Sequence, residues 1–381
     1  MDCIIENEFL KVKANTHGGE MISIKGKKSN EEYIWQGIPF WWKLYSPVLF
    51  PVIGKLKNFE YKYEGENYCM PQHGFASRIK YKLIENKDNI LAFELKNNEE
   101  TEKVYPFKFS LINQYKIEKN SIIITHKVKN LDDKNIYFSL GVHPAFKSPM
   151  YGEKDNLNDY YLKFNKLENA SILKINKDDF LTGEEEKYFD NCDELNLSKE
   201  VFKNGTLIFK NLKSDKITLK SRKHNRSVSL EFKGFPYLAL WAPEPDKKTN
   251  FVCIEPWFGH ADYEDFDGEL KDKEGIIELE ENKEFKCTYK ITIEEWFMVK
   301  MAYITLYKKF SFEQTNIVTK SYIRRCFQME KNNSIGCTVQ QCKHHDKSSD
   351  YCTLNQIMVG THEANPTVPE CTDCNSFELE Q

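Results

Sequence analysis

Apolar and polar residues alternate in short runs over most of the first 296 residues, which is the pattern of β-strands with one buried face. The stretch "YKLIENKDNILAFELKNN" (81–98) contains two such runs on either side of a turn at "NKDN". Residues 107–144 continue with strands separated by turns at "EKN" and "NLDDKN". Because turns recur about every 8–12 residues and no βαβ alternation is present, we predict an antiparallel sandwich or barrel.

The same alternation returns near residue 290, whereas helical periodicity is sparse. In "GIIELEENKEFKCTYKITI" (275–293) the residues that share one face are Cys287, Tyr289, Ile291 and Ile293. The stretch "DNCDELNLSKEVF" (190–202) is the one for which we predict a turn or two of helix.

Composition and charge narrow the class of protein. The chain has 54 Lys+Arg interleaved with 58 Asp+Glu, a net charge of −4, and 14% aromatic residues. This balance gives no basic field for nucleic acid or anionic lipid, and the aromatic content suits strands and an aromatic-lined cleft. The opening "MDCIIENEFL" lacks the positive charge of a signal peptide, and no apolar run reaches the roughly 18 residues of a membrane span. We expect a soluble, cytoplasmic protein without nucleic-acid or membrane partners.

The cysteines divide the chain unevenly. Six of the 11 are scattered over the first 330 residues, as expected of free thiols in a reducing compartment, and five crowd into Cys337–Cys374. We therefore predict a β domain over 1–296, a linker or read-through segment over 297–328, and a small Cys-rich domain over 329–381. Because the last piece begins with Met329, we hypothesise that the chain joins two neighbouring reading frames.

The Cys-rich piece has its own pattern, "CTVQQCKHHDKSSDYCTLNQIMVG … CTDCNSF". It resembles a short cysteine-bearing domain of unknown function from spore-forming bacteria. Four thiolates within about 40 residues of a cytoplasmic chain favour a structural metal over disulfides, but the spacing does not match a zinc ribbon, so both alternatives stay open. The residues concerned are Cys337, Cys342, Cys352, Cys371 and Cys374, with His344, His345 and His362 as alternative ligands.

Three polar clusters interrupt the apolar strands of the first domain: "MPQHGFASR" (70–78), "GVHPAF" (141–146) and "VCIEPWFGHAD" (252–262). Each places an ionisable residue, His73, His143 or Glu255, before a glycine or proline. Proline forces the preceding residue into an extended conformation, so we expect His143 and Glu255 at strand ends with fixed directions. The apolar neighbours of Glu255 desolvate its carboxyl and raise its pKa toward that of a general base. With Trp241 in "YLALWAPEP" to stack on a sugar, the set indicates a carbohydrate site.

Each of these residues also has a purely structural explanation, because histidine is often half-buried and a lone Glu at a strand end is often paired with a Lys. A Ser-His-Asp triad is poorly supported, since no serine lies in a nucleophile elbow. A zinc site from His73, His143 and Glu255 is possible by ligand type. However, no short spacing such as His-x-x-x-His is present, and we predict neither a metal nor a cofactor for this site.

Taken in order, "SPVLFPVIGKLKN … MPQHGFASR … FSLGVHPAF … FPYLALWAPEP … FVCIEPWFGHAD" resembles the aldose 1-epimerase (galactose mutarotase) superfamily, in particular its lactose-operon-associated subgroup. The resemblance covers about residues 1–296. It implies an all-β antiparallel β-supersandwich with a concave cleft for a pyranose, and a cofactor-independent isomerase whose partner is a small-molecule sugar.

The resemblance also implies roles for individual residues. His143 matches the general acid that protonates the ring oxygen, and Glu255 matches the general base that deprotonates the anomeric hydroxyl. His73 matches a second imidazole that holds the sugar. Lys55 stands where relatives carry an arginine, which keeps the charge and loses the bidentate fork.

A second departure from the family pattern is "HGFASR", in which Ser77 takes the place of an arginine and Arg78 comes one residue late. On a strand, a shift of one residue turns a side chain to the opposite face. We therefore expect a free aldohexose rather than a hexose 6-phosphate. The main rival is a non-catalytic sugar-binding or sensor protein of the same fold.

Overall fold

The chain forms two compact units, Met1–Trp296 and Phe297–Gln381. The computed structural model describes residues 1–148, 150, 156–198, 200–243 and 251–295 of the first unit. In the second it describes 332–337, 342, 344–345, 351–352, 354, 357, 359–361 and 372–374. The predicted linker over 297–328 and the start of the Cys-rich piece at residue 329 lie outside the described residues.

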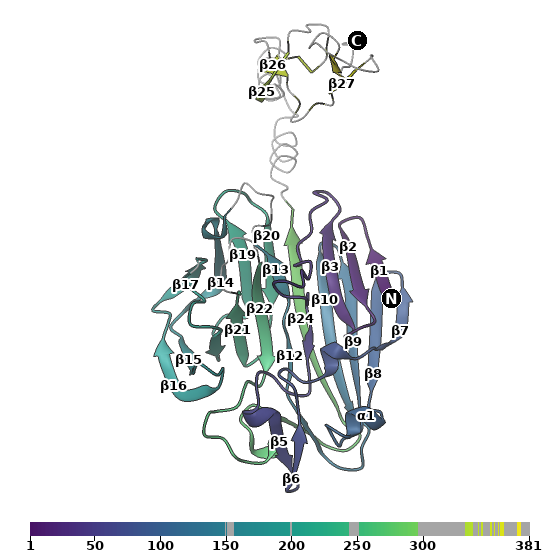
Figure 1. Cartoon of the computed structure of the whole chain (residues 1–381), viewed down its shortest axis with the longest axis vertical. Helices are drawn as coiled ribbons and strands as arrows, with labels where there is room; N and C mark the ends of the chain where they lie inside the picture. Colours follow the sequence, from purple (N-terminus) through teal and green to yellow (C-terminus); the bar gives the residue numbers. More distant parts are fainter. Residues whose placement is uncertain are drawn as a thin grey trace, which may run out of the picture. The chain divides into compact units, whose positions relative to one another are not determined.

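The first unit is built on two large antiparallel sheets (Figure 1). The nine-stranded sheet has the order β17-β14-β19-β20-β24-β10-β9-β8-β7. Its strands are β7 (Lys82–Lys87), β8 (Ile90–Lys96), β9 (Phe109–Glu118), β10 (Ser121–Asn130), β14 (Tyr160–Glu168), β17 (Cys192–Asn196), β19 (Lys216–Ser221), β20 (Ser227–Glu231) and β24 (Glu284–Glu294).

The eight-stranded sheet has the order β16-β15-β18-β21-β22-β12-β4, with β13 also paired to β22. Its strands are β4 (Val48–Leu49), β12 (Leu140–Val142), β13 (Ala145–Lys147), β15 (Ser171–Ile175), β16 (Leu181–Lys187), β18 (Leu207–Lys210), β21 (Tyr237–Trp241) and β22 (Phe251–Phe258).

Smaller elements surround these sheets. Three short sheets comprise β1 (Asp2–Glu6), β2 (Leu10–Asn15) and β3 (Glu20–Gly26); β5 (Glu60–Tyr63) and β6 (Glu66–Cys69); and β11 (Ile136–Phe138) and β23 (Ile277–Leu279). The helices described are α1 (Glu99–Glu102), η1 (Lys57–Phe59), η2 (Ala76–Arg78), η3 (Leu157–Asp159) and η4 (Leu270–Asp272). None of these helices has the length and apolar character needed to cross a membrane.

The side chains of β22 alternate between two faces of the sheet that have different surroundings. Val252 and Ile254 point into the main core, which also receives residues from the nine-stranded sheet such as Ile124 and Ile291. Cys253 and Glu255, on the alternate positions, face the other side of the sheet. All eight residues of this strand except the last are buried, so both of its faces are covered. The fold therefore carries a buried carboxylate on the face of this sheet that points away from the main core.

The structure agrees with the alternation read from the sequence over β24, whose predicted face (Cys287, Tyr289, Ile291, Ile293) is at most 7% exposed. The helix predicted within 190–202 is wrong, because Cys192–Asn196 forms β17 and pairs with β14. An available sheet edge decided this conformation, since strand preference depends on neighbouring strands more than on the segment itself. The short helix α1 was not predicted; Asn98 caps it by accepting the backbone N–H groups of Glu100 and Thr101.

The second unit contains two antiparallel pairs among its described residues: β25 (Asn332–Gly336) with β26 (Tyr351–Cys352), and β27 (Val359–Thr361) with β28 (Thr372–Cys374). Cys342, Cys352 and His345 are buried. The His345 backbone N–H donates to the Cys342 carbonyl (3.0 Å), and His345 forms a β-bridge with Cys352. The choice between a metal and disulfides in this piece stays a prediction, and two of the proposed ligands, Cys371 and His362, lie outside the described residues.

Candidate functional site

Glu255 lies in the middle of β22, opposite Ala239 of β21. The sequence-based expectation that Glu255 ends a strand is wrong, because Pro256 is accommodated within β22. A proline is tolerated there because the neighbouring strand on one side is interrupted at this level, so no partner requires its missing N–H.

That interruption is the sequence His143-Pro144. β12 ends at Val142 and β13 begins at Ala145, and both strands pair with β22 on the same side. The break therefore lies opposite the residues around Glu255, and it turns the imidazole of His143 toward the carboxyl group. The His143 backbone N–H donates to the Pro47 carbonyl (3.0 Å), which fixes the main chain at this point.

His143 and Glu255 are in direct contact. His143 Nε2 lies 3.2 Å from Glu255 Oε2, and their side chains are 11% and 1% exposed. Neither Glu255 oxygen, nor His143 Nδ1, has a well-aligned hydrogen-bond partner among the described residues. Buried polar atoms are normally paired, so these atoms are available to a ligand that enters the site.

Burial pushes the two pKa values apart. It raises the pKa of the Glu255 carboxyl well above its ordinary value, with a smaller opposing effect from the Trp257 indole. Burial, and then the neighbouring imidazole of His73, holds the pKa of His143 well below 6.5. Over the intervening pH range the pair therefore holds one labile proton and has no net charge.

His73 is held in one tautomer by its own turn. Its backbone adopts a left-handed conformation (φ 63°), and Gly54 donates its N–H to His73 Nδ1 (3.1 Å) while its carbonyl accepts the N–H of His73 (2.9 Å). The next residue is Gly74 because a Cβ there would lie 2.1 Å from the Phe50 carbonyl oxygen. Since Nδ1 accepts a hydrogen bond, the ring proton of neutral His73 is on Nε2.

Removal from water, together with the charge of Arg78, lowers the pKa of His73 to about 4. At neutral pH this imidazole is uncharged and can donate one hydrogen bond. Its ring centroid lies 5.8 Å from that of His143, with the two rings perpendicular.

The predicted binding residues stand around the same pair. The ring of Trp241 lies 5.7 Å from that of His143, edge to face. Lys55 Nζ donates to the Asp178 carbonyl (3.1 Å) and lies 5.1 Å from the Phe180 ring centroid.

The expectation that Arg78 points to the opposite face of a strand is wrong. Ala76–Arg78 is a short 3-10 helix rather than a strand, so the shift of one residue does not turn Arg78 to an opposite sheet face. Its side chain is exposed and is 3.5 Å from the Gln72 carbonyl.

All six predicted residues line one cleft of about 820 Å³. This size and its mixture of aromatic walls with a few polar groups are typical of a small-molecule site. The residues are Lys55, His73, Arg78, His143, Trp241 and Glu255.

Sequence reasoning missed Trp42, which also lines the cleft and stacks on His143 at a centroid distance of 4.9 Å. The aromatic cluster "FWWKLY" (40–45) was a signal for it, but the run has no strand period that would have placed one ring in the site.

The zinc site considered from the sequence consisted of His73, His143 and Glu255. Among the described residues, the side chains that come together as potential ligands are His143, Cys253 and Glu255, with donor atoms within 4.8 Å of one another, and His73 is not part of this group. Bonds of about 2.0–2.3 Å in a tetrahedral zinc site would need closer donors. Cys253 is fully buried behind the cleft and does not line it.

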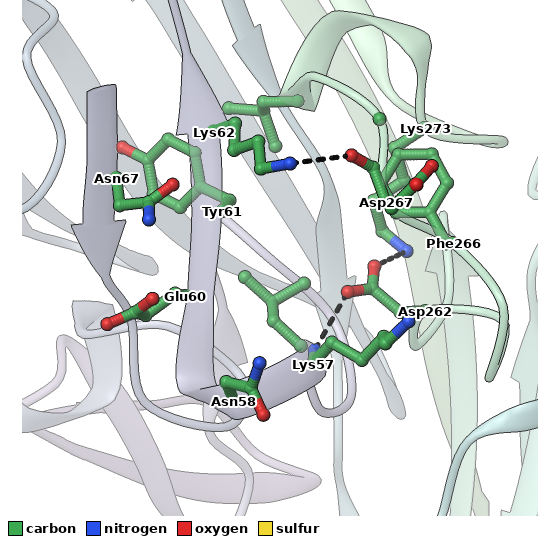
Figure 2. Close-up of a pocket in the computed structure, with 13 residues that line it drawn as sticks. Lys57, Asn58, Glu60, Tyr61, Lys62, Asn67, Asp262, Phe266, Asp267 and Lys273 are labelled. Atoms are coloured by element: carbon green, nitrogen blue, oxygen red, sulfur yellow. Dashed lines mark hydrogen bonds and ion pairs between the residues drawn. The ribbon is translucent and has the colours of Figure 1, made fainter. Parts of the chain in front are cut away.

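A second, smaller pocket of about 200 Å³ lies beside the segment that carries Lys55, and Figure 2 shows its lining residues. At its base, Lys273 Nζ donates to Asp262 Oδ1 (2.7 Å), with the two side chains 3% and 5% exposed. Asp262 Oδ2 accepts the backbone N–H of Lys57 (2.9 Å), and its own N–H donates to the Lys55 carbonyl (3.0 Å). This buried pair therefore fixes one wall of the main cleft from behind.

Comparisons with known proteins identify relatives of both parts of the chain. Residues 2–278 match the model of the family described as Aldose 1-epimerase, and residues 335–377 match a domain of unknown function, DUF1540. The chromosomal protein LacX of Lactococcus lactis subsp. lactis is 31% identical over 297 residues, which cover 76% of this chain and 98% of LacX.

Two solved structures are similar over the same region. A galactose mutarotase related enzyme from Lactobacillus acidophilus has 35% identity and a TM-score of 0.73, and the match covers 77% of this chain and 98% of that chain. A galactose mutarotase-like protein from Lactobacillus casei ATCC 334 has 30% identity and a TM-score of 0.72, over 77% and 100%. These matches confirm both predicted resemblances and the galactose mutarotase-like β fold.

We predict that Lys273→Met lowers the free energy of unfolding by about 3–5 kcal/mol, because it leaves the Asp262 carboxylate buried without its counter-charge. Chemical denaturation of the full chain measures this, with Lys271→Met as the matched control on an exposed lysine two residues away. A loss no larger than that of Lys271→Met would show that the pair does not stabilise the cleft wall.

Proposed function

Because the chain belongs to the aldose 1-epimerase family, we propose that its first unit interconverts the α and β anomers of a free aldohexose without a cofactor. The observation that carries this proposal is the contact between His143 and Glu255 at the cleft, 3.2 Å apart. The anomeric oxygen O1 and the ring oxygen O5 of a pyranose are bonded to the same carbon. An acid and a base that act on these two oxygens must therefore lie within a few Å of each other, as this pair does.

In the proposed mechanism the Glu255 carboxylate removes the proton from O1 while the His143 imidazolium gives a proton to O5. The C1–O5 bond breaks, C1 and O1 become the aldehyde, and the open chain rotates about C1–C2. Closure onto the other face of the aldehyde returns both protons and yields the other anomer. Positioned proton transfer of this kind contributes about 10²–10⁴-fold.

The buried pair suits this exchange because its net charge stays at zero. Before ring opening it is a carboxylate and an imidazolium, and afterwards it is a carboxylic acid and a neutral imidazole. Burial disfavours charge, so it favours the second arrangement, which is the one that accompanies the open-chain sugar. His73, uncharged and with its proton on Nε2, donates a hydrogen bond that holds the sugar near O5, and the Trp241 ring packs against the apolar face of the sugar.

We expect Glu255→Gln and His143→Asn each to lower kcat by about 10²–10⁴-fold, because each removes one partner of the proton exchange. NMR exchange spectroscopy between the anomers of galactose and of glucose measures the rate, and calorimetry measures sugar binding. Glu280→Gln, at an exposed carboxylate outside the cleft, is the control and should keep full activity. Sugar binding by the unaltered protein without faster anomer exchange would instead favour the non-catalytic sugar-binding alternative.

The rate should follow a bell-shaped pH profile. The active pair holds one labile proton. Below the lowered pKa of His143 it takes up a second proton and Glu255 cannot act as a base; above the raised pKa of Glu255 it has none to give. The acid limb should therefore lie well below pH 6.5. An acid limb measured at the ordinary histidine value of about 6.5 would contradict the assignment of His143 as the acid. The pH profile of His73→Gln shows whether the titration of His73 contributes to this limb.

A second candidate substrate is an aldose that carries an anionic group such as a phosphate. The supporting observation is that Arg78 and Lys55 both line the cleft, and neither forms an ion pair with a carboxylate in the described part of the chain. Arginine and lysine bind phosphate through charge-assisted hydrogen bonds.

To separate the two candidates, kcat/KM can be compared for galactose and glucose and for their 6-phosphates, in the unaltered protein and in Arg78→Gln. For a free-aldose enzyme we expect the unphosphorylated sugars to be preferred and Arg78→Gln to lower their kcat/KM less than about tenfold, roughly the effect of losing one charged hydrogen bond. Preference for the phosphates, lost selectively in Arg78→Gln, would establish the anionic substrate class.

A further inference from the structure

The ring of Trp42 forms one wall of the site beside His143. The two rings are stacked, with centroids 4.9 Å apart and an interplanar angle of 29°. Trp42 also stacks on Phe251 (5.5 Å, 26°) and meets Trp241 at 6.0 Å and 60°. The imidazole is therefore covered on one face by an indole.

The position of Trp42 is fixed from the buried side. The Trp35 indole N–H donates to the Trp42 carbonyl (2.7 Å), and the Trp42 backbone N–H donates to the Ile38 carbonyl (3.0 Å). Trp35 is 5% exposed and its ring lies 4.6 Å from that of Phe251. The segment that carries Trp42 is thus anchored to the aromatic cluster beneath β22.

The groups around His143 differ in their effect on its charge. The Glu255 carboxylate favours the imidazolium, whereas burial and the imidazole of His73 disfavour it. The buried Cys253 thiol, whose pKa burial raises well above its ordinary value, carries no charge. Trp241 meets the ring edge to face. Trp42 instead presents the face of its π-system, which carries partial negative charge and attracts a cation.

We infer that Trp42 is a positioning residue for the proposed reaction: its stacked ring fixes the orientation of His143 and stabilises the imidazolium that donates the proton to O5. This inference rests on the proposed function. It explains how a buried site that favours the neutral pair still populates the charged form that begins each turnover. Trp35 supports the arrangement through its hydrogen bond to the Trp42 carbonyl.

The test compares Trp42→Leu, which removes the π-face but keeps apolar bulk, with Trp42→Phe, which keeps a smaller aromatic face. Trp41→Leu is the matched control, since Trp41 packs edge to face on Phe40 (4.6 Å) and does not line the cleft. In the full chain, the ¹⁵N chemical shifts of the His143 ring, followed from neutral to acidic pH, show at which pH the ring becomes protonated, with His143→Asn to assign the signals. Thermal unfolding of each variant verifies that it is folded.

In Trp42→Leu we expect the His143 ¹⁵N titration to move to lower pH and kcat to fall about 30-fold, the size of a desolvated cation–π contact. Trp42→Phe should recover most of both effects, and Trp41→Leu should change neither. An unchanged ¹⁵N titration with a raised KM would overturn the inference and make Trp42 a sugar contact only. Unchanged shifts and unchanged kinetics would also overturn it.

The NMR readout keeps this inference separable from the proposed function. It is recorded on the free protein and needs no turnover. If Trp42→Leu alters the His143 signals while Glu255→Gln and His143→Asn leave anomer exchange intact, Trp42 tunes the imidazole but the proposed catalytic roles are wrong. If the catalytic variants are inactive and the His143 signals of Trp42→Leu do not differ from those of the unaltered protein, the proposed catalytic roles stand and the inference about Trp42 is wrong.

Discussion

The contact between a buried carboxylate and a buried imidazole is the constraint on which the rest of the site depends. Either group alone would be costly to bury in its charged form. Together, Glu255 and His143 can share one labile proton at zero net charge, so the protein can keep both away from water. The oxygens of Glu255 then remain without aligned partners among the described residues, and a sugar that brings its own hydroxyl groups can satisfy them.

The fold creates this contact through two coincident irregularities. The strand next to β22 is broken at His143-Pro144, and β22 itself contains Pro256 at the same level. A regular ladder on that side would require an N–H that proline does not have. The break removes the requirement and frees His143 to turn toward Glu255. The same alternation that sends Val252 and Ile254 into the core places the carboxyl group on the opposite face, which lines the cleft.

The walls of the cleft are held from outside it. Gly54 fixes the tautomer of His73, the buried Asp262–Lys273 pair fixes the segment that carries Lys55, and Trp35 anchors Trp42. Supporting interactions of this kind are what keep side chains in a site oriented well enough for catalysis. They also account for the polar residues that lie next to the site without lining it. The residues that line the cleft all come from the first unit, which also carries the family match.

Much of the architecture and most of the candidate residues followed from local sequence. The alternation over β24 predicted a buried face because a strand places every second side chain on one side. His73, His143 and Glu255 were found because each ionisable residue stands beside a glycine or proline in apolar surroundings, and the order of the motifs identified the family. The sequence did not predict strand β17, because pairing with β14 settled its conformation, nor the 3-10 turn that keeps Arg78 on the cleft.

What the sequence determined by itself is therefore the antiparallel β character, the buried face of β24 and the chemical identity of the site residues, all of which depend on neighbours in the chain. Only the tertiary structure decided that His143 and Glu255 meet, that Trp42 stacks on the imidazole, and that Glu255 lies inside a strand rather than at its end. Those features depend on which strands pair and at what register. Residues more than one hundred positions apart set that register, and no local pattern records it.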